Sequence, residues 1–307
     1  DRADAAWLYA ELSQLDERDE VAAIAGLVDP ASNQSRLTSV VLQELLACEA
    51  APEVYAAMAA GIIEDDRYTS YFRDRACELL AQAGPEAEPY IMAWIAGSNP
   101  DMQVYIVQTC YYMLAISWSR GDAYPPSVTH IVASLLASPY LWNISAGLTV
   151  LDHLSFGYFL SAAEEFEQYM LFRPALEKLF VHAYITVVDE ALHHALGMIE
   201  RMQDRLGELD SRVIEMWAWL LSQSDIEAKY AASEALRAIA QKVTGVIVED
   251  RRSREELRPI VEEGLRANLN PVVRDRLEAA IEWLDIGDAR TAEWMAERDA
   301  AQALPSE

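Results

Sequence analysis

Two eight-residue stretches far apart in the chain carry the same pattern, RDRACELL at Arg73–Leu80 and RDRLEAAI at Arg274–Ile281. Both place small or apolar residues at offsets 3, 6 and 7 from the first arginine, a spacing that puts them on one face of an α-helix. KYAASEAL at Lys229–Leu236 and QVYIVQTC at Gln103–Cys110 fall into the same register. Segments that repeat one buried face predict a chain built from repeated helices.

Short turns rich in Asp, Asn, Ser and Pro separate the predicted helices. Such turns stand at Asp29-Pro30, Asp65-Asp66, Asn99-Pro100-Asp101, Ser138-Pro139, Ser224-Asp225 and Asn270-Pro271. The first four follow one another at intervals of 35 to 39 residues. That interval is the length of a helix–turn–helix unit, so the chain is expected to consist of paired antiparallel helices.

This pattern resembles the HEAT repeat, whose second helix typically follows an Asp/Asn-Pro-like turn, carries Arg or Lys one turn in, and continues with Ala and Leu facing the core. The copies run, from the clearest to the loosest, over Gly264–Leu284, Leu220–Ile239, Ile91–Met113, Ala59–Ala83 and Val21–Leu46. The resemblance implies an α-solenoid that serves as a scaffold or a binding surface. The tetratricopeptide pattern competes, but its Trp, Gly and Tyr positions are not met here.

Composition favours an all-α fold. Twelve Gly and twelve Pro in 307 residues are below average usage, and strong helix formers fill the stretches between them. We expect a single HEAT-like domain over residues 1–307, with an irregular helical centre at about 156–209. There, Arg173-Pro174 predicts a helix start, and Ala175–Leu206 forms either one long helix or two closely joined ones. The β-branched and then charged segment Val243–Arg254 predicts a long loop.

The charge of the chain favours a basic partner. Fifty Asp and Glu against 24 Lys and Arg give a net charge of −26, which argues against nucleic acid, because phosphate binding needs clustered cations. No apolar run reaches the roughly 18 residues that cross a membrane, and the acidic start lacks the regions of a signal peptide. Three widely spaced cysteines fit a reducing compartment. A cytoplasmic location is therefore predicted.

Aromatic residues form the first set of candidate partner contacts. Tyr105 and Tyr111 occupy the positions that Arg276 and Glu282 fill in the last repeat, where side chains should meet water. Exposed tyrosine is typical of interface hot spots. In the alternative interpretation, neighbouring helices cover these rings. Trp142 joins the same surface in one of the two registers in which its repeat can be aligned.

Acids at the turns form the second set, and the predicted contacts among them are Asp65, Asp66 and Asp101. With Asp29 and Asp225 they would recur along one edge of stacked repeats and steer a basic partner towards it. They would also cap the second helices, because a carboxylate accepts backbone N–H bonds at a helix start. The two roles are compatible, since a capping carboxylate keeps its charge.

No pattern predicts catalysis, a metal or a cofactor. Glu190 and His193 lie one turn apart like two metal ligands, but di-iron bundles need a second Glu-x-x-His step, and the chain has none. Asp152 and His153 are adjacent on a helix and so point about 100° apart, and no Gly-x-Ser-x-Gly elbow is present. The basic cluster Arg251–Arg254 lies among acids that neutralise it, which favours a solvated loop over an anion site.

These observations predict a non-enzymatic α-solenoid that recognises a basic protein or peptide. An immunity or inhibitor protein that blocks a basic toxin or nuclease is one setting, and a scaffold is another. The alternative is an enzyme built on HEAT-like repeats, similar to bilin lyases or to alkylpurine DNA glycosylases. The negative charge argues against the glycosylase, whereas the aromatic-rich stretch Ala76–Phe172 leaves room for a pigment pocket.

Overall fold

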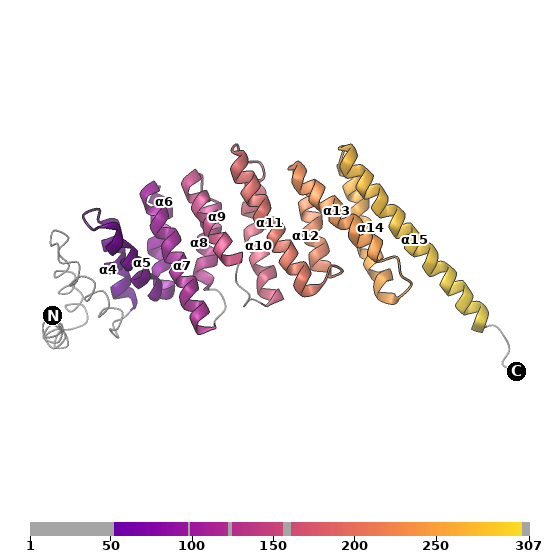
Figure 1. Ribbon diagram of the computed structural model, residues 1–307, viewed down its shortest axis with the longest axis horizontal. Coiled ribbons are helices and arrows are strands. Elements are labelled where there is room, and N and C mark those ends of the chain that lie inside the picture. The colour runs from indigo at the N-terminus through magenta and orange to yellow at the C-terminus, as the bar shows by residue number, and fades with distance from the viewer. Residues whose placement is uncertain (1–51, 98, 122–124, 156–160, 303–307) are drawn as a thin grey trace. The chain divides into compact units, whose positions relative to one another are not determined.

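The computed structural model describes residues 52–97, 99–121, 125–155 and 161–302, and every regular element within these ranges is helical. The chain divides into two compact units, residues 1–160 and 161–307, and each is described by itself (Figure 1). The single domain predicted from the sequence stays a prediction. The loosest copy at Val21–Leu46, the turn at Asp29-Pro30 and Cys48 lie outside the described residues.

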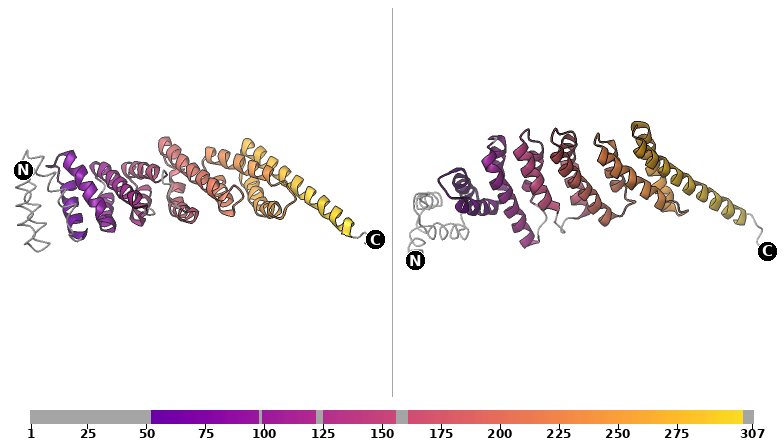
Figure 2. Two further views of the ribbon diagram at one scale, coloured as in Figure 1. Left: turned by 60° about the horizontal axis from the view of Figure 1, so that its bottom comes forward. Right: turned by 45° about the horizontal axis from the view of Figure 1, so that its top comes forward.

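In its described part, unit 1 consists of alternating first and second helices. The first helices are α4 (Pro52–Glu64), α6 (Glu88–Gly97) and α8 (Pro126–Leu136), and the second helices are α5 (Ser70–Gln82), α7 (Gln103–Arg120) and α9 (Leu141–Ser155). Helix α5 packs on α7, and α7 packs on α9, while α6 packs on α8. The three second helices therefore lie side by side in one layer (Figures 1 and 2).

Unit 2 repeats this alternation. Its first helices are α10 (Ala162–Leu179), α12 (Ser211–Ser222) and α14 (Val248–Ala267), and its second helices are α11 (Ile185–Leu206), α13 (Ile226–Lys242) and α15 (Pro271–Gln302). Each first helix packs on the second helix that follows it. Helix α13 also packs on α15, and α12 packs on α14, so the last two pairs meet through like helices. Between the first two pairs, the second helix α11 packs on the first helix α12.

The predicted turns that fall within the described ranges all join a first helix to its second helix. The capping prediction is correct for Asp225, whose Oδ1 accepts the backbone N–H of Ala228 at 2.8 Å at the start of α13. It is wrong for Asp65, which accepts the N–H of Arg67 inside the turn and does not cap α5. It is also wrong for Asp101, because Asn99 supplies the accepting side chain in that turn.

Two local predictions fail where tertiary packing or side-chain pairing favours a helix. Pro174 lies inside α10 and does not start it. The loss of one helical hydrogen bond there is offset by burial of Phe172 and Leu176 on either side of the proline. The predicted loop at 243–254 is short, since α14 already begins at Val248.

The four-residue spacing of opposite charges explains the early start of α14. Arg251 pairs with Glu255, and Arg252 pairs with Glu256, each at 3.0 Å. Pairs at this spacing stabilise a helix, and both place the arginine and the glutamate on neighbouring turns.

In the ranges that the structure covers, no helix is both long and apolar enough to cross a lipid bilayer.

Candidate interaction surface

The layer of second helices in unit 1 carries a group of tyrosines and acids at its solvent side. We call Tyr71, Asp74, Tyr111, Tyr112 and His153 the tyrosine face. Tyr71 and Asp74 belong to α5, Tyr111 and Tyr112 to α7, and His153 to α9. Tyr111 is 40% exposed, and Tyr71 is exposed as well. The prediction that Tyr111 meets water is therefore confirmed, and its exposure follows from the helical position that it shares with Glu282.

Contacts across the tyrosine face link all three helices. The hydroxyl of Tyr112 donates to Oδ2 of Asp74 at 3.3 Å, which joins α7 to α5. The ring of Tyr111 meets the imidazole of His153 edge to face, with 5.4 Å between the ring centroids, and this contact joins α7 to α9. Burial is the main cause that raises the pKa of Tyr112, so its hydroxyl keeps its proton and remains a donor at neutral pH.

Tyr105 is half-buried and does not belong to this face. The guanidinium of Arg73 lies 4.2 Å from the centre of its ring. Nε of Arg73 donates to the carbonyl oxygen of Ile63 at 2.6 Å, which holds the arginine against the end of α4. A neighbouring helix thus covers one side of Tyr105, as the alternative interpretation of the sequence expected.

Trp142 is also half-buried, in the first turn of α9. Its ring stacks on Tyr140 with 5.1 Å between the centroids and 16° between the planes. Its indole Nε1 is buried and donates no hydrogen bond to a described residue. Trp142 therefore packs on a residue of the turn between α8 and α9, and its role in binding stays a prediction.

The predicted acids lie in the turns that precede α5 and α7. Asp65 pairs with Arg67, whose Nη2 lies 2.6 Å from Oδ2 of the carboxylate. The side-chain and backbone hydrogen bonds from Arg67 lower the pKa of Asp65 to about 2. Asp66 and Asp101 are exposed, and neither makes an ion pair with a described residue. Asp66 and Asp101 thus present exposed carboxylates that no described cation pairs with directly, whereas Asp65 is paired within its own turn.

One more acid adjoins the tyrosine face in sequence. Asp152, next to His153 on α9, is exposed and makes no ion pair with a described residue, and within the face Asp74 accepts the neutral Tyr112 hydroxyl. Arg75 is the cation of α5 on this side, and it pairs with Glu78 at 2.7 Å. The sequence alone did not single out Tyr71, Asp74 or Tyr112, because their grouping depends on which helices lie side by side.

The residue pairs considered for metal binding or catalysis do not form larger clusters. Within the described ranges, no group of three His, Cys, Asp or Glu side chains is placed to hold a metal ion. A catalytic Asp–His pair needs a hydrogen bond between the two side chains. The imidazole of His153 instead contacts the ring of Tyr111. Burial raises the pKa of the Cys77 and Cys110 thiols to about 12, so both are poor nucleophiles at neutral pH.

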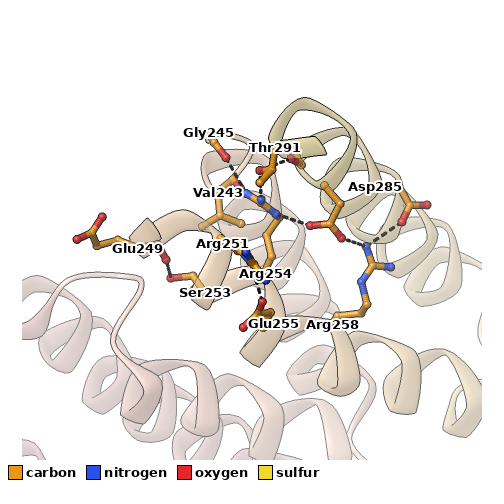
Figure 3. A network of polar contacts seen from close by, with 12 residues as sticks. Val243, Gly245, Glu249, Arg251, Ser253, Arg254, Glu255, Arg258, Asp285 and Thr291 are labelled. Atoms are coloured by element: carbon orange, nitrogen blue, oxygen red, sulfur yellow. Dashed lines mark hydrogen bonds and ion pairs between the residues drawn. The ribbon is translucent and has the colours of Figure 1, made fainter. Parts of the chain in front are cut away.

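The basic cluster on α14 contains one arginine that the sequence misassigned. Arg251 and Arg252 are exposed, as expected, but Arg254 is only 1% exposed. Its Nη1 donates to the carbonyl oxygens of Val243 and Gly245 at 2.6 and 2.8 Å (Figure 3). The prediction of a solvated cluster is wrong for Arg254 because these carbonyls supply acceptors inside the protein.

The other donors of Arg254 reach α15. Nη2 donates to Oγ1 of Thr291 at 2.6 Å, and Nε donates to Oδ1 of Asp288 at 2.8 Å. Arg258, one turn along α14, bridges Asp285 and Asp288 (Figure 3). Burial alone would raise the pKa of Asp288, but the hydrogen bonds from both arginines outweigh it and lower that pKa. Arg254 thus joins α14, α15 and the preceding turn.

Comparison with known proteins assigns no family or function to the chain. No family model matches the chain, and no curated protein matches it. The contacts, exposure and charge of the residues described above are therefore the basis for inferring a function.

Proposed function

We propose that the chain is a HEAT-like α-solenoid that binds a basic protein or peptide without catalysing a reaction. The alternation of first and second helices in both units supports the repeat architecture, because successive pairs within a unit pack on one another, mainly through like helices, with α11 on α12 as the exception. The net charge of −26 supports a basic partner. Such binding would serve either an immunity or inhibitor protein or a scaffold.

The tyrosine face is the observation that carries this proposal. It presents the partly exposed ring of Tyr111 on α7, and the neighbouring helices α5 and α9 carry the carboxylates of Asp74 and Asp152. Tyrosine rings and carboxylates together suit lysine and arginine side chains, which can lie over the rings while pairing with the acids. Asp66 and Asp101 in the adjoining turns add charge that would speed encounter with such a partner.

Replacing Tyr111 by Ala should weaken binding of the partner by about 2 kcal/mol, roughly 30-fold, because the ring acts as an anchor. The same change should lower the free energy of unfolding by less than about 1 kcal/mol, since the ring is partly exposed. A photo-crosslinking residue at position 111 would first identify the partner in cells. Calorimetry with the purified partner and urea unfolding then give the two free energies.

Tyr184→Ala provides the matched control for Tyr111→Ala, because Tyr184 is exposed in unit 2. Its removal should leave the affinity unchanged. If Tyr111→Ala instead destabilises the fold strongly and leaves the affinity intact, the ring belongs to the core and the tyrosine face is not the binding surface.

The association rate should fall steeply as salt rises, because the Debye length shortens from about 10 Å at 0.1 M to about 3 Å at 1 M. The double substitution of Asp66 and Asp101 by Asn should lower the rate at low salt and flatten its salt dependence. Glu297→Gln removes one negative charge at an exposed position on α15. It is the control for either single substitution, Asp66→Asn or Asp101→Asn, measured separately. Stopped-flow measurements would test this, and a rate that is independent of salt would contradict steering by the acids.

A further inference from the structure

A pocket of about 270 Å³ opens in unit 2 beside the ends of α12 and α14. Leu221 from α12 and Ile260 and Ala267 from α14 supply apolar walls, and Lys229 from the first turn of α13 completes one side. This volume is enough for a leucine-sized or phenylalanine-sized side chain. The pocket lies on helices distinct from those of the tyrosine face.

Polar groups at the pocket lack partners within the described residues. Lys229 makes no ion pair or side-chain hydrogen bond there, and neither does the exposed Glu263. Asn268 is 3% exposed, and its Nδ2 donates to the carbonyl oxygen of Gly264 at 2.8 Å. Its Oδ1 accepts no hydrogen bond from a described residue. A buried acceptor without a donor is costly, and a bound group that supplied an N–H would relieve that cost.

Apolar side chains continue outside the pocket along the two adjacent turns. Leu269, next to Asn268, is 88% exposed, and Val272 is exposed one turn further along. Ile226 is exposed at the start of α13, three residues before Lys229. An apolar surface that extends past a small pocket suits a segment of a macromolecule better than a free small molecule.

Acids dominate the charge around this surface. Exposed carboxylates that make no ion pair with a described residue are Glu227, Glu262, Glu263 and Asp275. The cations nearby are Lys229, Arg266 and Arg274. The guanidinium of Arg266 donates to the backbone of Glu262, and that of Arg274 donates to the backbone of Leu265 and Asn268 and pairs with Glu278. The rim of the pocket therefore complements basic side chains.

We propose that this pocket anchors an apolar side chain of a peptide segment whose flanking residues are Lys or Arg. The flanking cations meet Glu263 and the neighbouring acids. Lys229 donates to a backbone carbonyl of the segment, and the amide oxygen of Asn268 accepts a backbone N–H. The basic character of the segment rests on the proposed function, whereas the anchoring of an apolar side chain rests on the pocket itself.

Calorimetric titration of the whole chain with three capped hexapeptides tests this proposal at about 0.15 M salt, where weak surface attraction is reduced. The probes are Lys-Arg-Leu-Leu-Arg-Lys, the same peptide with Ser in place of Leu, and Glu-Asp-Leu-Leu-Asp-Glu. The first should bind at least about tenfold more tightly than either of the others. If the serine peptide binds as tightly as the leucine peptide, the pocket does not anchor an apolar side chain. If the acidic peptide binds more tightly than the basic one, the segment is not basic.

Substitution at the pocket gives the second arm of the experiment. Ala267 is exposed at the pocket, so Ala267→Phe should fill it without disturbing the core and weaken the leucine peptide at least about tenfold. Ala292→Phe, at an exposed alanine of α15 outside the pocket, should leave its affinity unchanged. Unchanged binding in Ala267→Phe, or no binding of the leucine peptide to the parent chain at about millimolar concentration, would overturn the proposal.

Tyr111→Ala separates this proposal from the proposed function. If the pocket is the binding site, that variant binds the leucine peptide as the parent chain does. If Tyr111→Ala no longer binds the leucine peptide while Ala267→Phe binds it with full affinity, the pocket proposal is overturned. The tyrosine face is then the binding surface for the peptide. If only Ala267→Phe loses binding of the leucine peptide, the pocket proposal is supported, whatever the partner of the tyrosine face proves to be.

Discussion

Replacing Arg254 by Ala is expected to lower the free energy of unfolding by about 3–5 kcal/mol. The guanidinium is buried and donates to two backbone carbonyls, to Thr291 and to Asp288. Its removal takes this donor from the two carbonyls and from Thr291, and it leaves Asp288 with Arg258 as its remaining cationic partner. Urea unfolding followed by circular dichroism measures the change.

Arg252→Ala is the matched control, because Arg252 is on the same helix, its side chain is 80% exposed, and it pairs only with Glu256. Its loss should change the free energy of unfolding by about 0.5 kcal/mol or less. Arg254→Lys keeps the charge but cannot reproduce the forked donors, so it should also be clearly destabilising. Equal effects of Arg254→Ala and Arg252→Ala would show that the buried network adds little to stability.

The buried face of the quoted helices was predictable because it depends on local periodicity. The residues placed on the core face of the first quoted stretch, Ala76, Leu79 and Leu80, are all buried. In the second quoted stretch, Leu277 and Ala280 are buried as well, and Ile281 is half-buried. Helical spacing fixes which side chains share a face, so a single sequence is enough to find the buried face of each helix.

The pair α10–α11 could not be found in the same way because its turn has different chemistry. Residues 180–184 join the two helices without an Asp-Pro or Asn-Pro step. Instead, Nδ1 of His182 accepts the backbone N–H of Tyr184 at 3.3 Å. Pro174 added a false helix start, because its local preference for the first turn of a helix is overridden by packing along α10.

The environments of individual candidate residues depended on contacts between helices. Tyr111 and Tyr105 lie on the same helix, yet Arg73 from α5 covers only Tyr105. Arg254 appeared solvated because acids surround it in sequence, whereas its partner Asp288 is 34 residues away. Gly287 makes room for this arginine, since an added Cβ there would lie 2.8 Å from Cδ of Arg254. Neither contact follows from the period of one helix.

Replacing Trp219 by Ala should lower the free energy of unfolding by about 3–5 kcal/mol, as truncation of a large buried aromatic does. Trp219 is buried in α12. Its ring meets Tyr169 edge to face at 5.4 Å between centroids, and it contacts Phe180 at 5.8 Å. Its indole Nε1 donates to Oε1 of Glu177 at 2.7 Å, so the change removes both packing and a hydrogen bond between α12 and α10.

Two tryptophan variants separate these contributions in the same urea titration. Trp219→Phe keeps an aromatic ring and loses the N–H donor, so its expected cost is smaller, about 1–2 kcal/mol. Trp294→Ala removes a tryptophan that is 44% exposed on α15, and it should cost less than about 1 kcal/mol. If Trp294→Ala proved as destabilising as Trp219→Ala, the ring contacts between α10 and α12 would not distinguish a core tryptophan from a surface one. The assignment of Trp219 to the core of unit 2 would then be wrong.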